Sequence, residues 1–192
     1  MKSTLRRTLA VITLSSAGVL FQACGPAYDL YCNIPARFVV SNVLSVSPTL
    51  YRSCTSLGEF CTITNPASDA KRLHFNSIGP KEPPYPMPEL MARNIVLGLG
   101  GLIVGLPSIA EQLEQEPKVV CFDLTCPNCY NDYNISPLMQ YTRLGYVDCT
   151  SCKRSYDLNN IGIVSSGEAG RALFRYRVSY FPSTNTLSIV NR

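Results

Sequence analysis

Two pairs of cysteines carry the clearest chemical signal in this sequence. Cys126 and Cys129 form one C-x-x-C motif, and Cys149 and Cys152 form a second one nineteen residues later. Each motif lets two thiolates from one tight loop face the same point, so the two loops together offer four sulfur ligands for a tetrahedral metal site. We therefore predict that the four cysteines bind one metal centre. Two disulfides, or four structural thiols, are the alternative.

The segments that lead into these loops have the composition of β-strands. Residues 119–124 run directly into the first pair, and residues 146–148 lead into the second. Residues 171–180 form a long amphipathic pattern that we expect to pair with residues 186–190. Strand-like segments are short and separated by turn residues, and no long helical period is present, so we predict an all-β fold, a sandwich or a barrel.

The N-terminal half follows the same pattern. We expect strands at residues 34–40, 43–46 and 72–76, and a hairpin whose arms are residues 50–54 and 60–64. The proline-rich stretch 80–88 is predicted to be an extended surface connection. The glycines between residues 98 and 105 do not complete a nucleotide-binding motif, because Ile103 stands where its third glycine belongs; we expect two strands joined by a Gly100–Gly101 turn.

The first 23 residues have the pattern of a secretory signal. Residues 1–7 are basic, residues 8–20 are mostly apolar, and this apolar stretch is too short for a comfortable transmembrane helix. Because Cys24 follows at the cut point, the segment resembles a bacterial lipoprotein signal. That resemblance implies that Cys24 is acylated, becomes the new N-terminus and holds the protein to a membrane of the cell envelope, facing the periplasm or the outside. The alternative is an ordinary secretory signal with Cys24 incidental.

Removal of this signal would leave 169 residues, which is consistent with one domain and a real hydrophobic core. Three of the 17 basic residues would leave with it, so 14 basic residues would remain against 13 acidic ones. Since the remainder is almost neutral and has no basic run interleaved with aromatic residues, we expect no nucleic-acid binding. The longest apolar run, residues 95–106, is too short to span a membrane.

Four further cysteines lie outside the paired motifs and permit three disulfide connectivities. Cys54 and Cys61 flank the loop of the predicted hairpin, where facing positions bring side chains close enough for a disulfide. If they pair, Cys32 is left with Cys121. The alternative is that Cys121 is a buried reduced thiol or a substitute metal ligand.

The cysteine loops and the residues after them resemble the Rieske iron–sulfur domain. The similar segments are Phe122–Cys129, Cys149–Cys152, Ser155–Leu158 with Gly162, and Leu173–Val178. The resemblance covers about residues 94–191 and implies an antiparallel β-sandwich with two metal-binding loops. We therefore expect a signal peptide at 1–23, an N-terminal β segment with the proline-rich connection at 24–93, and a Rieske-like domain at 94–192.

One departure from that family changes the expected metal. A Rieske site needs two histidines, but the chain has one, His74, which lies outside the similar region. Cys152 stands at the position of the second-loop histidine, and Cys129 or Asn128 at that of the first. Any cluster would therefore have four cysteine ligands and a lower potential than the Rieske range. We expect a [2Fe–2S] cluster, with one zinc ion as the close alternative and mononuclear iron third.

The remaining residues give little sign of catalysis. His74 stands alone, and we expect Asp123, Asp148 and Asp157, which lie near the cysteines, to face solvent rather than act as an acid–base pair. We therefore expect no enzyme, but a membrane-anchored lipoprotein that transfers electrons to an unknown redox or protein partner. The alternatives are a binding or structural lipoprotein stapled by zinc, and an oxygenase ferredoxin subunit. Lys153 and Arg154 would offset the sulfur charge or be solvated.

Overall fold

The computed structural model describes residues 30–112 and 114–191 of the chain. Within it, residues 31–191 belong to one compact unit. The predicted signal peptide and Cys24 lie outside the described residues, so both stay predictions. Among the described residues, no helix is long and apolar enough to cross a membrane.

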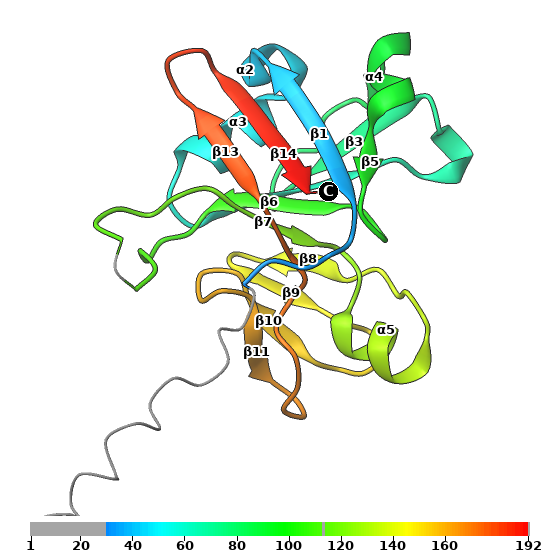
Figure 1. The fold of residues 1–192 in the computed structure, drawn as a ribbon, viewed down its shortest axis with the longest axis vertical. Helices are drawn as coiled ribbons and strands as arrows, with labels where there is room; N and C mark the ends of the chain where they lie inside the picture. Colours follow the sequence, from blue (N-terminus) through cyan, green and yellow to red (C-terminus); the bar gives the residue numbers. More distant parts are fainter. Residues whose placement is uncertain (1–29, 113, 192) are drawn as a thin grey trace, which may run out of the picture. The chain divides into compact units, whose positions relative to one another are not determined.

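Three antiparallel sheets make up this unit, which confirms the predicted all-β class (Figure 1). The first sheet has the order β13 (Val178–Phe181), β14 (Thr186–Asn191), β1 (Ala36–Ser41), β5 (Val96–Leu97). The second has the order β12 (Arg175–Tyr176), β7 (Val120–Asp123), β6 (Leu102–Leu106), β2 (Glu59–Thr64), β3 (Arg72–Asn76), β4 (Tyr85–Pro86). The third has the order β11 (Ile163–Ser166), β10 (Ser155–Asp157), β9 (Tyr146–Asp148), β8 (Gln140–Arg143).

The six-stranded sheet lies between two hydrophobic cores. Because side chains alternate along a strand, Val104 and Cys121 pack into the core shared with the first sheet. Their neighbours Ile103 and Phe122 pack into the core shared with the cysteine loops and the third sheet. Figure 1 shows β6 and β7 between the other two sheets. The strand that ends at the first cysteine pair is thus fixed on both faces.

Strands from both sides of residue 93 pair with one another in these sheets. β1 pairs with β14 along its whole length, from Ala36 opposite Asn191 to Ser41 opposite Thr186. β2 pairs with β6, from Glu59 opposite Leu106 to Ile63 opposite Leu102. The predicted boundary at residues 93 and 94 falls inside α4 (Glu89–Asn94) and does not separate two sheets.

The predicted hairpin at residues 50–64 is wrong in its first arm, and so is the strand at 43–46. These residues form the helices α2 (Val43–Val46) and α3 (Pro48–Thr55). Ser47 caps α3, since its Oγ accepts a hydrogen bond from the Leu50 N–H at 2.9 Å, and Pro48 fills the first helical position. Glu82, from the proline-rich stretch, holds the same end by accepting from Ser47 Oγ at 2.7 Å.

One further segment differs from the expectation. The predicted long strand at 171–180 is split into β12 in the central sheet and β13 in the first sheet, because the chain crosses from one sheet to the other near Arg177. Its predicted pairing with the C-terminal strand is confirmed, with Val178 opposite Ile189. The helix α5 (Pro127–Tyr133) follows the first cysteine of the first pair. A short 3-10 helix covers Ala67–Asp69.

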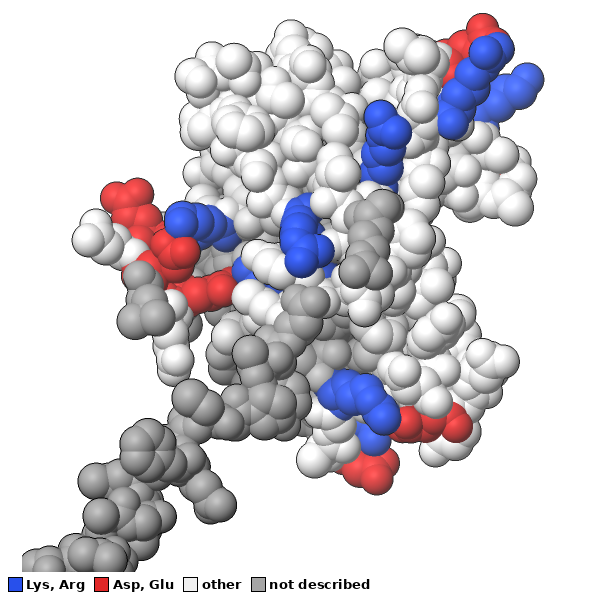
Figure 2. Space-filling view, viewed as in Figure 1, with Lys and Arg blue, Asp and Glu red and all other residues white. Residues whose placement is uncertain are grey.

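Charged residues are distributed in small groups of mixed sign. On the face drawn in Figure 2, Lys and Arg lie singly or in small groups, and several lie beside Asp or Glu. Arg52 and Glu59 pair at 3.3 Å, and Arg143 and Asp148 at 3.0 Å, with both arginines at least half exposed. Pairs of this kind contribute about 0–1 kcal/mol each, so the fold depends chiefly on its two cores.

Candidate metal centre

The first cysteine loop joins β7 to α5. Cys126 is the residue before the helix, Pro127 occupies its first turn, and Cys129 lies one turn further along. Proline is favoured at this position because a backbone N–H there would have no acceptor within the helix, so its loss costs nothing. The fixed φ of proline also suits a helix. Residues three apart lie on the same side of a helix start, so both sulfurs point in one direction.

The second cysteine loop is a tight turn between β9 and β10. The N–H of Lys153 donates to the carbonyl oxygen of Cys149 at 2.9 Å. The N–H of Cys149 donates to the carbonyl oxygen of Arg154 at 2.9 Å. Lys153 has a positive φ of 60°, which lets the chain reverse within four residues. Two strands of the third sheet therefore hold Cys149 and Cys152 from both ends of the turn.

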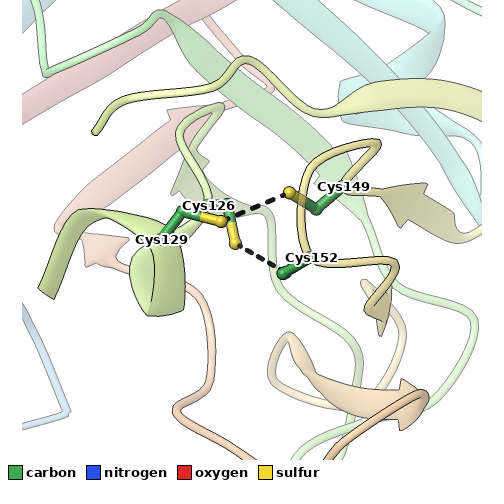
Figure 3. Close-up of side chains that lie close together, drawn as sticks. All are labelled: Cys126, Cys129, Cys149 and Cys152. Carbon is green, nitrogen blue, oxygen red and sulfur yellow. Dashed lines mark hydrogen bonds between the residues drawn. The ribbon is translucent and has the colours of Figure 1, made fainter. Parts of the chain in front are cut away.

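The two loops bring all four sulfurs together, as predicted. Cys126 Sγ lies 3.6 Å from Cys152 Sγ, and Cys129 Sγ lies 3.7 Å from Cys149 Sγ (Figure 3). All four Sγ atoms lie within 4.8 Å of one another. A tetrahedron with metal–sulfur bonds of about 2.3 Å has edges of about 3.8 Å, so this group is the right size for four thiolates around one ion. The residues present can hold a metal.

Burial makes Cys129 and Cys149 hard to ionise without a cation. Cys126, Cys129 and Cys149 are buried, and Cys152 is half-buried. Burial, followed by the neighbouring thiols, raises the pKa of Cys129 to about 12. Burial also raises the pKa of Cys149, although N–H groups of Cys152 and Ser151 donate to its sulfur. A metal ion would replace these protons and supply the positive charge that four converging thiolates lack.

Arg154 supplies one fixed positive charge beside the sulfurs. Burial acts to raise the pKa of Cys152, but hydrogen bonds from the Arg154 side chain and backbone bring it down to about 7. The guanidinium is held by Glu168, whose Oε2 accepts from Nη2 at 2.9 Å and whose carbonyl accepts from Nε at 2.8 Å. Arg154 is only 6% exposed, so it is not a solvated side chain. Its position beside Cys152 fits the alternative in which it offsets the sulfur charge. Lys153 is exposed.

Tyr156 and Asn128 orient the first loop through a contact that the sequence analysis did not predict. Tyr156 Oη lies 3.1 Å from Cys126 Sγ and accepts a hydrogen bond from Asn128 Nδ2 at 2.9 Å. Burial and the Cys126 sulfur both raise the pKa of Tyr156, so its hydroxyl is a donor toward that sulfur.

Asn128 also ties the loop to a distant part of the chain. Its Oδ1 accepts from the N–H of Arg171 at 2.9 Å, and its Nδ2 donates to the carbonyl of Arg171 at 3.0 Å. Gly170 permits this contact, because a Cβ there would overlap the Asn128 amide. The one sequence signal for this contact is an asparagine inside a C-x-x-C loop, because an amide that becomes buried there must find hydrogen-bond partners.

Asp123 does not face solvent, and the prediction that it would is wrong. Its carboxylate is fully buried and accepts hydrogen bonds from the N–H of Leu99 at 2.7 Å, the N–H of Thr125 at 2.6 Å and the hydroxyl of Tyr176 at 2.6 Å. Burial raises the pKa of Asp123, and these donors act in the opposite direction. The donors replace water around the charge, and they also fix the backbone just before Cys126.

The other predicted residues lie outside the sulfur group. His74, in β3, pairs with Asp69 at 3.1 Å. Asp157 and Asp148 are half-buried. Asp157 accepts a hydrogen bond from the N–H of Asn159, and Asp148 accepts one from the guanidinium of Arg143. None of them joins the group of metal-ligating atoms found among the described residues.

The structure describes free thiols at the four remaining cysteines, Cys32, Cys54, Cys61 and Cys121. The hairpin argument for a Cys54–Cys61 disulfide no longer holds, because Cys54 lies on α3. Cys61 and Cys121 face the first core on either side of Val104. The two disulfides, Cys54–Cys61 and Cys32–Cys121, stay predictions that peptide mapping of the non-reduced protein would test.

The sequence matches no model of a known protein family, and no curated protein shows significant similarity to it. The metal centre is therefore argued from its own geometry.

Proposed function

We propose that Cys126, Cys129, Cys149 and Cys152 bind one zinc ion, which crosslinks the two cysteine loops. We propose further that the protein is anchored by a lipid in the cell envelope. The observation that supports zinc most directly is the size of the sulfur group, in which all four Sγ atoms lie within 4.8 Å of one another. Zinc prefers closed tetrahedral sites of this kind and has no redox chemistry.

The same distance argues against the [2Fe–2S] cluster that the sequence led us to expect. A two-iron cluster gives two thiolates to each iron, so sulfurs on different irons lie roughly 5 Å or more apart. The sulfur group described here is more compact than that. The cluster remains the second candidate because of the Rieske-like sequence around the loops, and mononuclear iron has the same geometry as zinc.

A structural role fits the surroundings of the sulfurs better than catalysis. Four thiolates complete a tetrahedron and leave no open position for a substrate. Three of the four cysteines are buried. Arg154 and Tyr156 contact the sulfurs as hydrogen-bond donors, which is what ligand-orienting groups of a structural site do. We accordingly propose a binding or scaffolding protein rather than an enzyme.

The membrane anchor is supported by the sequence alone. Cys24 follows a signal-like segment, and the compact unit begins at Tyr31, so six residues would connect an acylated Cys24 to the folded part. A Rieske-like sandwich held close to a membrane surface by that tether is the arrangement we propose.

Metal analysis of the purified protein, together with its visible spectrum, tests the proposal. We expect about one zinc per chain and no colour, whereas two irons per chain with charge-transfer bands would overturn zinc in favour of the cluster. Cys149→Ser should lose the metal. Cys54→Ala is the matched control, because it removes a buried thiol outside the sulfur group and should retain it. Equal metal content in both variants would refute the assignment of ligands.

A further inference from the structure

The strand β13 leaves one edge of the first sheet without a partner. It is the end strand of that sheet and pairs only with β14, from Val178 opposite Ile189 to Phe181 opposite Thr186. In an antiparallel ladder every second residue directs its N–H and C=O to the other side. Within the described part of the chain, Val178–Tyr180 make no backbone hydrogen bond on that outer side.

The outer edge of β13 lines a groove. The cleft has a volume of about 610 Å³ and contains consecutive residues of the strand, from Val178 to Pro182, along one side. The cleft is also lined by Leu106, by residues 117–119, and by Cys54 and Thr55 from the end of α3. A groove that is lined by consecutive residues of an end strand and by apolar side chains can accept an extended chain.

The groove carries little charge. Lys118 is the one basic or acidic side chain among the lining residues, and its Nζ already pairs with Glu114 Oε2 at 2.6 Å. Phe181 is 50% exposed at the end of the strand. An occupant that brought an unpaired charge into this groove would lose hydration without gaining a partner, so an uncharged, apolar segment fits best.

β13 also lacks the features that protect other sheet edges. Among the described strands, the end strands β4, β5 and β12 are two residues long, β8 carries Arg143, and the pairing of β11 is interrupted by an irregular register. β13 has four residues with no charge, no proline and no shift of register. Proteins usually blunt such an edge, because it otherwise recruits another strand.

We propose that β13 is a docking site for an extended segment of a partner polypeptide, apolar at every second residue, which adds to the first sheet as a fifth strand. The partner's backbone would hydrogen-bond the outer edge of Val178–Phe181. Its apolar side chains would fill the groove against Leu106 and Val119. This site is separate from the metal centre and does not depend on which metal is bound there.

The probe is a pool of capped hexapeptides with apolar residues at alternate positions, and the matched control pool carries a central proline. Amide exchange is followed residue by residue in the full metal-loaded protein. We expect the first pool to slow exchange about tenfold or more at alternate residues of β13, and the proline pool to have no effect. No protection by either pool would overturn the proposal.

Two exposed positions give matched variants. Phe181→Lys places a charge in the groove and should weaken binding of a selected peptide about tenfold or more, since edge charges are what prevent strand addition. Val190→Lys is the control, because Val190 is 51% exposed in the same sheet and does not line the groove. Equal weakening by both variants would contradict the assignment.

Protection of the outward-facing β13 amides, those not bonded to β14, in the absence of peptide would also count against a partner segment. If that protection rises with protein concentration, a second copy of the chain occupies the edge. If it does not change with concentration, another segment of the same chain occupies it. Either result overturns the proposal as stated.

Discussion

Replacing Asn128 by alanine should loosen the first cysteine loop more than any comparable surface change on α5. The side chain makes three hydrogen bonds: a buried one with the hydroxyl of Tyr156 and two partly buried ones with the backbone of Arg171. A net contribution of about 0.5–1.5 kcal/mol for each hydrogen bond, with both Arg171 backbone groups left unpaired, gives a loss of roughly 2–4 kcal/mol in the free energy of unfolding.

The control for this prediction lies one turn further along the same helix. Asn131 donates a single hydrogen bond to the carbonyl of Pro127 at 2.7 Å, and its side chain is exposed. Asn131→Ala should therefore cost about 1 kcal/mol or less. Both variants have the same composition change on the same helix, so the difference between them reports the contact with Arg171.

Urea unfolding at a fixed free zinc concentration measures both losses, and competition with a chelator measures metal affinity. Because Tyr156 would lose its donor from Asn128, we expect Asn128→Ala to release metal about 10–100-fold more readily, as is usual when a group that orients a ligand is removed. Equal stability and equal metal affinity in the two variants would refute the role assigned to Asn128.

Three further variants test the proposed anchor and the surroundings of Asp123. Cys24→Ala should leave the protein unprocessed or release it from the membrane fraction, and normal processing with membrane retention would contradict the anchor. Gly98→Ala should destabilise the fold by about 1–3 kcal/mol, since Gly98 has a φ of 67° and a Cβ there would overlap Tyr176 and Asp123; a melting temperature equal to wild type would count against it. Asp123→Asn should leave the Thr125 N–H facing an amide donor, at a cost of about 1–3 kcal/mol. Burial raises the pKa of Asp123 from 3.8 in the folded state, so its contribution is complete below that value and is lost as pH rises through the folded pKa. The stability difference between wild type and Asp123→Asn should therefore narrow toward pH 7, which unfolding curves at several pH values would show.

The sequence was most informative where the structure depends on local spacing. The convergence of the four cysteines follows from two short motifs, and β6 and β7 follow from their apolar runs. The helix α3 was missed although Ser47 and Pro48 are a recognisable start signal, because the β-forming residues after them suggested a hairpin.

Contacts between distant segments were beyond prediction. The Asn128–Arg171 pair joins residues 43 positions apart, and no periodicity or motif relates them. The burial of Asp123 depends on three donors from three different segments, which only the completed fold brings together. An acidic residue in a strand is therefore read as solvent-facing until its donors are known.

The pairing of β1 with β14 has a consequence for the order of folding. Ala36 lies opposite Asn191, so the first sheet closes a loop of nearly the whole described chain, whereas the cysteine loops span only residues 126–152. On loop-closure entropy alone, the longer closure costs about 1.5 kcal/mol more than the shorter one. The cysteine loops can thus come together as soon as their own residues are available, while β1 must wait for the last strand to be made. A chain that loses residues 186–191 would keep its four cysteines but leave β1 and β13 without the strand that lies between them.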